Sequence, residues 1–156
     1  MKKTLATLLA VGLCFGLTGC GTVYEDTNGE DDYSLQTITE ENIVNLDLGA
    51  SGFAHEKTEA FGVTSEEYKS KNFNGVERLY LTNFIAKSDV NIYVGHFNLK
   101  KGNIRLVCVL DGKIIKDIPV DTFAEIIRFE DIKGTFEIMI AGESANFSLN
   151  IDPEYI

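Results

Sequence analysis

Apolar and polar residues alternate most clearly near the C-terminal end of the chain. Residues 136–140 carry an apolar side chain at every second position, and residues 146–151 repeat this pattern after a short Gly-containing segment. A period of two is typical of a β-strand with one buried face. The two runs therefore predict a β-hairpin that buries one face and leaves the other in water.

The region before these runs also predicts strands. Apolar residues occupy the even-numbered positions over 90–94 and then the odd-numbered positions at Phe97 and Leu99. A bulge at Gly95-His96 would return the apolar side chains to one face, because a bulge inserts one residue and Gly tolerates its geometry.

Residues 104–110 are apolar on nearly every position, which predicts a strand that is covered on both faces. Asp111-Gly112 follows and is a strong signal for a two-residue hairpin. Pro119 should end the next strand or place it at an edge. Residues 123–129 are a further strand candidate.

The segment before residue 75 gives two conflicting signals. Residues 37–40 (Thr-Ile-Thr-Glu) fit a capping box and would start a short helix. The apolar alternation over 44–48 instead favours a strand that ends at Gly49. We expect the strand.

These strands are short and separated by Gly, Asp and Asn turns, with no long helical pattern after residue 50. The pattern predicts an all-β domain, a single antiparallel β-sandwich of the jelly-roll-like or immunoglobulin-like kind, over residues 37–156. A small up-and-down barrel is the alternative.

The N-terminus has the pattern of an export signal. Lys2 and Lys3 precede an apolar stretch over 5–17, and small residues follow it. A transmembrane helix needs about 20 predominantly apolar residues, so this stretch is too short to be a good membrane span.

The run Leu17-Thr18-Gly19-Cys20 resembles the lipobox of bacterial lipoproteins. In that family the Cys receives a diacylglyceryl thioether and becomes the first residue of the mature chain. The resemblance implies a lipoprotein signal peptide over 1–19, lipid attachment at Cys20, and a location on the extracytoplasmic face of the cell membrane.

Residues 20–36 are polar and acidic without apolar periodicity, which predicts a flexible linker. The acids from Asp26 onward do not match a calcium-binding loop, because Gly29 is fourth in the run and an EF-hand needs Gly at the sixth position. His55 and His96 have no zinc-ligand spacing. We expect no metal and no cofactor.

The chain has 24 acidic and 14 basic residues, a net charge of −10. Such an excess repels nucleic acid and anionic lipid head groups, so we expect neither as an electrostatic partner. Cys14 would leave with the signal peptide and Cys20 would carry lipid. Cys108 lies in an apolar run and is interpreted as a small buried hydrophobe.

No catalytic constellation is visible. No motif places a Ser near either His, and residues 49–52 (Gly-Ala-Ser-Gly) lack the spacing of a nucleophile elbow. We therefore expect no catalytic residues. The chain has no Trp, so a sugar-stacking surface would have to use Tyr. Tyr80 and Tyr93 lie off the main apolar parity; they form a candidate binding face, or they pack on the second layer of the sandwich.

Three segments, 73–75, 100–115 and 134–151, resemble a group of small lipoproteins of low-GC Gram-positive bacteria whose exported part is one β-sandwich. The resemblance implies a fold and a location but no activity. We expect a non-enzymatic, membrane-anchored lipoprotein whose sandwich binds an envelope protein, a wall polymer or another polysaccharide. The alternative is a structural or stress-related envelope lipoprotein with no small ligand.

Overall fold

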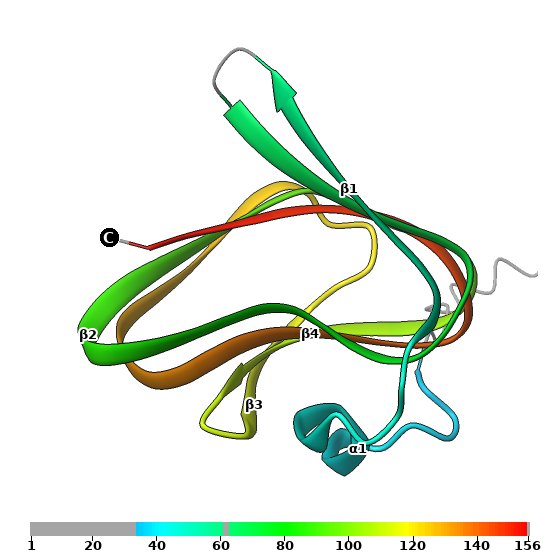
Figure 1. Cartoon of the computed structure of the whole chain (residues 1–156), viewed down its shortest axis with the longest axis horizontal. Coiled ribbons are helices and arrows are strands. Elements are labelled where there is room, and N and C mark those ends of the chain that lie inside the picture. Colours follow the sequence, from blue (N-terminus) through cyan, green and yellow to red (C-terminus); the bar gives the residue numbers. More distant parts are fainter. Residues whose placement is uncertain (1–33, 61–62, 156) are drawn as a thin grey trace, which may run out of the picture. The chain divides into compact units, whose positions relative to one another are not determined.

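The computed structural model describes residues 34–60 and 63–155 of the chain. The predicted signal peptide, the lipobox with Cys20, and nearly all of the predicted linker lie outside these residues. The elements in chain order are α1 (Glu40–Asn45), β1 (Ser51–Ala60), β2 (Val63–Leu110), β3 (Lys113–Ile118) and β4 (Phe123–Tyr155) (Figure 1). The strands form an antiparallel sheet that does not close into a barrel, so the all-β prediction is confirmed and the barrel alternative is wrong.

The two long strands, β2 and β4, pair with each other in two ladders. In the first ladder, residues 67–96 of β2 run antiparallel to residues 123–150 of β4. In the second, residues 90–110 of β2 run antiparallel to residues 136–155 of β4. β1 adds to the first ladder by pairing with the start of β2, and β3 adds to the second by pairing with the end of β2.

Both long strands bend, and Figure 1 shows β2 and β4 turning together and returning on the other side of the core. The bends divide the strands into two layers, as expected for a β-sandwich. Layer A consists of β3 and residues 75–84, 104–110 and 134–142; layer B consists of β1 and residues 63–73, 90–99, 123–129 and 145–155.

The two alternating C-terminal runs do not form the predicted hairpin. Ile138 pairs with Tyr80 on one side and with Cys108 on the other, and Leu149 also has β2 on both sides. The runs are consecutive parts of β4, which passes from layer A to layer B near residues 142–145. A period of two is the same in a hairpin and in one bent strand. The pattern therefore predicted the strands correctly but not their partners.

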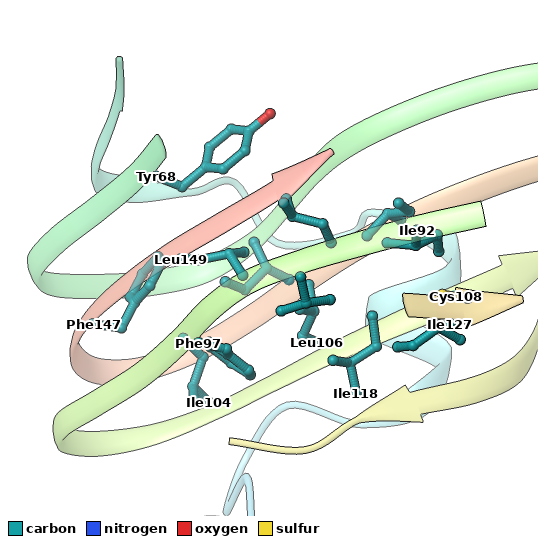
Figure 2. Packing of buried hydrophobic residues seen from close by; sticks show 14 of the residues in the cluster. Tyr68, Ile92, Phe97, Ile104, Leu106, Cys108, Ile118, Ile127, Phe147 and Leu149 are labelled. Atoms are coloured by element: carbon teal, nitrogen blue, oxygen red, sulfur yellow. The ribbon is translucent and has the colours of Figure 1, made fainter. Parts of the chain in front are cut away.

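The main core lies between the two layers. It contains fully buried aromatic and aliphatic side chains from both long strands, among them Phe97, Phe136, Ile138 and Leu149. Figure 2 shows members of this core, including Phe97, Leu106 and Leu149, meeting between the strands, with Tyr68 at one edge and its hydroxyl pointing away from the cluster. Cys108 is fully buried in this core, as predicted.

A second apolar cluster covers the outer face of layer A. Ile43 of α1 is fully buried there against Val107, Val109 and Met139. The prediction that residues 104–110 are covered on both faces is confirmed. The predicted water-exposed face of residues 136–140 is wrong, because Met139 is buried in the cluster with α1 and Glu137 is buried in an ion pair with Arg78.

A short helix does form before residue 50, but its capping box is not the one predicted over residues 37–40. Thr39 caps α1 and forms a capping box with Asn42, and Leu46 ends the helix with a left-handed φ of 55°. The expected strand over residues 44–48 is wrong, because its first two residues belong to α1, and Leu46 and Leu48 are each 38% exposed and not paired in a sheet.

Three local predictions are confirmed. Asp111 and Gly112 have φ values of 46° and 73° and join β2 to β3 in a two-residue hairpin. β3 ends at Ile118, immediately before Pro119. The ladder register shifts between Val94 and His96, where the bulge was expected.

Candidate binding surface

The outer faces of the two layers differ. α1 packs on the outer face of layer A, whereas none of the described elements packs on the outer face of layer B. Side chains on layer B alternate between the core and this open face, because successive residues of a strand point to opposite sides. We call the open side the polar face; its side chains include Glu67, Lys69, Lys71, Asn91, Tyr93, His96, Asn98, Lys100, Ile126, Asn146, Ser148, Asn150 and Asp152.

Tyr93 is the aromatic side chain at the centre of the polar face. It lies between the fully buried Ile92 and the fully buried Val94 in sequence, whereas Tyr93 itself is 46% exposed. Its pairing partners on the two neighbouring strands are Asp152 and Ile126, and Ile126 is 51% exposed. An accessible ring therefore adjoins an apolar side chain and a carboxylate.

The other tyrosine of the predicted face lies elsewhere. Tyr80 belongs to layer A, pairs with Ile138, and packs half-buried against the main core. This burial raises the pKa of its phenol. The structure therefore does not bring Tyr80 and Tyr93 together, and only Tyr93 contributes to an open surface.

The two histidines each lie near a carboxylate that the sequence pattern did not reveal. His96, at the bulge, has its Nε2 atom 3.9 Å from Glu67 Oε1. His55 stacks on Tyr68 with ring centroids 4.5 Å apart, and its Nε2 atom is 3.5 Å from Glu66 Oε2. Glu66 lies on the strand segment next to that of His55, whereas Glu67 and His96 lie on opposite sides of the same β4 segment, so only the ladder registers identify these partners.

A depression of about 650 Å³ lies where β1 and β2 face the edge of layer A, and His55, Tyr68 and Arg78 line it. Tyr68 donates a 2.8 Å hydrogen bond to Glu66 Oε2. Burial, together with this bond, raises the Tyr68 pKa well above its ordinary value. The phenol thus keeps its proton at neutral pH.

A second depression, of about 620 Å³, lies on the polar face. Its lining includes three lysines, one glutamate and two short polar side chains: Lys69, Lys71, Lys100, Glu67, Asn146 and Ser148. Glu67 Oε2 accepts from Lys69 Nζ at 2.8 Å. The sequence pattern does not reveal this group, because its members lie on three strand segments that only the ladder registers bring together.

Glu143 anchors the start of the described chain. Its carboxylate accepts hydrogen bonds from the backbone N–H groups of Gln36, Thr37 and Ile38 at 2.6–3.0 Å and from the Thr37 hydroxyl at 2.7 Å. Burial alone would raise the pKa of Glu143, but these bonds outweigh it and lower the pKa to about 2. Glu143 therefore holds the backbone in place by hydrogen bonds at the point where the predicted linker ends.

Within the described ranges there is no group of three side chains arranged to hold a metal ion. Nor does that part of the chain contain a helix long and apolar enough to cross a membrane. No family model matches this chain, and no curated protein matches it at a significant level.

Proposed function

We propose that the chain is a lipoprotein anchored through Cys20 on the extracytoplasmic side of a membrane, where its sandwich binds an envelope component. Two features support this proposal: the lipobox resemblance of Leu17-Thr18-Gly19-Cys20, and a β-sandwich with one face covered and the other open. The open polar face is the observation that carries the binding role.

The chemistry of the polar face favours a glycan or wall polymer over an apolar protein surface. Tyr93 offers an exposed ring on which the apolar face of a sugar can pack. Asn91, Asn98 and Asp152 belong to the same face, and amides and carboxylates are the groups that pair with ring hydroxyls. A few polar groups around an aromatic side chain are typical of a site that orients a small polar ligand.

The anchoring role can be tested at two cysteines. We expect Cys20→Ala to abolish lipid labelling and to release the chain from the membrane fraction, because the thioether has no other attachment point. Cys14→Ala is the matched control and should leave both unchanged, since Cys14 lies inside the predicted signal peptide. Continued lipid labelling of Cys20→Ala would show that the anchor assignment is wrong.

The binding role can be tested at two exposed tyrosines. We expect Tyr93→Ala to weaken binding to a cell-wall polysaccharide preparation about tenfold, because stacking on an aromatic ring contributes on the order of 1 kcal/mol. Tyr155→Ala is the control: Tyr155 is 62% exposed but contacts Phe84 on the side of the core.

Binding can be measured by co-sedimentation of the full chain with purified wall material. Equal binding by both variants and the wild type would exclude the polar face as the binding surface. A wild-type chain without saturable binding to any wall or envelope component would favour the structural, ligand-free alternative.

A further inference from the structure

We infer that the lysine-lined depression on the polar face takes an anionic group carried by a sugar, either a phosphate or a carboxylate. The inference rests on the proposed function and specifies the chemistry of its ligand. Lys71 and Lys100 are the residues assigned to the anion, and Asn146 and Ser148 are assigned to the hydroxyl groups beside it.

The ladder registers bring these side chains together from three adjacent strands. Lys69 pairs with Ser148, and Asn98 pairs with the same serine from the opposite side. Lys71 lies two residues beyond Lys69 and therefore points to the same face. Lys100 lies two residues beyond Asn98, also on that face. Adjacent strands are about 4.8 Å apart, so lysines that flank one central strand can reach a common ligand.

The charges within the depression are unequal. Lys69 is already paired, with its Nζ atom 2.8 Å from Glu67 Oε2 and 3.5 Å from Glu56 Oε2. Across the described ranges, no carboxylate oxygen lies within 4.0 Å of the ammonium group of Lys71 or Lys100. Two lysines with no ion-pair partner among the described residues therefore line the depression, and an anion bound there would be attracted by both.

The acidity of the whole chain does not oppose a local anion site. The net charge is −10, but charges separated by more than about 8 Å are largely screened at physiological ionic strength. The nearest carboxylate in the depression, Glu67, is neutralised by its contact with Lys69. Lys71 and Lys100 therefore make the main electrostatic contribution to a bound anion, and that contribution is attractive.

The depression lies at one end of a row of side chains on the polar face. Tyr93, His96, Asn98 and Lys100 follow one another along a single stretch of β2, with the bulge between the first two. An extended polymer along this stretch would meet the tyrosine ring at one end and the lysines at the other. The ligand class that fits both ends is a polysaccharide with anionic substituents.

The test uses the full-length chain in a nonionic detergent, labelled with ¹⁵N and titrated with glucose 6-phosphate, glucuronate and glucose. We expect the two anionic sugars to shift the amide resonances of Lys69–Lys71, Lys100 and Asn146–Ser148, and glucose to shift them far less. Tighter binding of the first or the second anion identifies phosphate or carboxylate as the preferred group. Equal effects of glucose and both anions would overturn the inference.

Matched variants separate this site from general charge effects. We expect the double variant Lys71→Gln/Lys100→Gln to bind the preferred anionic sugar about tenfold more weakly, as exposed charge pairs each contribute modestly. The control, Lys113→Gln/Lys116→Gln, removes the same charge from the exposed side of β3. Glu67→Gln should instead tighten binding, because it removes the carboxylate that lines the depression and the shorter of the two ion pairs of Lys69.

An equal loss of anionic-sugar binding in both double variants would overturn the assignment of the anion site to Lys71 and Lys100. A wall polysaccharide that binds the wild type and Lys71→Gln/Lys100→Gln equally well would overturn this inference while leaving the proposed function in place. Failure of every wall component to bind the wild type would instead overturn the proposed function.

Discussion

Glu143 shows how one partly exposed side chain can fix a backbone segment more than 100 residues away in sequence. Its carboxylate satisfies three consecutive N–H groups of residues 36–38, just before α1 begins. The sequence placed Glu143 in a Gly-containing turn of a hairpin. Nothing in a local pattern could reveal its partners, because they are backbone groups of a distant segment.

Acid should weaken this contact. The pKa of Glu143 is about 2 in the folded chain, against an ordinary value of 4.5. A carboxylate whose pKa is lower in the folded state stabilises the fold above pH 4.5, and this contribution is lost as the pH falls from 4.5 toward 2. We expect Glu143→Gln to lower the free energy of unfolding by about 1 kcal/mol at pH 7 and by much less at pH 2.

Thermal unfolding followed by circular dichroism at both pH values would measure this difference. Glu125→Gln is the control, since Glu125 lies on an exposed part of β4. A destabilisation of Glu143→Gln that is the same at pH 7 and at pH 2 would contradict the role of the ionised carboxylate.

Individual elements follow the sequence wherever the deciding interaction is local. The hairpin at Asp111-Gly112 needs two left-handed residues, and Asp-Gly supplies them with little strain. The bulge at Gly95-His96 was visible as a shift of apolar parity. The sequence also indicated a helix start close to α1, but two residues too early: the capping box uses Thr39 and Asn42 in place of residues 37 and 40. The competing alternation spans only five residues, which is weak evidence for a strand.

Two glycines offer a matched test of the hairpin. A Cβ atom at Gly112 or at Gly49 would meet no atom within 4 Å, but Gly112 has a φ of 73° whereas Gly49 has no left-handed φ. We expect Gly112→Ala to lower the free energy of unfolding by about 1–2 kcal/mol, because a side chain is strained in the left-handed region. Gly49→Ala should change it little or raise it slightly.

Chemical denaturation would measure the free energy of unfolding of both variants. If Gly112→Ala were as stable as Gly49→Ala, the backbone conformation assigned to the turn would be wrong.

At the scale of the whole molecule, two clusters have different roles. The main core joins the two layers, and the cluster around Ile43 attaches α1 to the outer face of layer A. Loss of the first should separate the layers. Loss of the second should release only the helix and expose the apolar side chains beneath it.

We therefore expect Ile138→Asp to abolish cooperative unfolding, because a carboxylate cannot be buried unpaired in the main core. Ile43→Asp should keep the β-type circular dichroism spectrum, lose about 2–3 kcal/mol of stability, and bind a hydrophobic dye such as ANS. Glu41→Gln, on the exposed side of α1, should neither lower the stability nor cause dye binding. Cooperative unfolding of Ile138→Asp at an unchanged temperature would show that the core assignment is wrong.

The sequence by itself determined which residues after 75 are extended, where the tight turn and the bulge lie, and that Cys108 is buried, because these depend on neighbours in the chain. It also carried the lipobox resemblance at Cys20. Only the tertiary structure decided the partners of each strand, the covering of layer A by α1, the separation of Tyr80 from Tyr93, and the position of Lys71 and Lys100 around one depression. The reason is physical: the side-chain period of a strand records which face is apolar, but the register between strands depends on how two long strands bend around a common core.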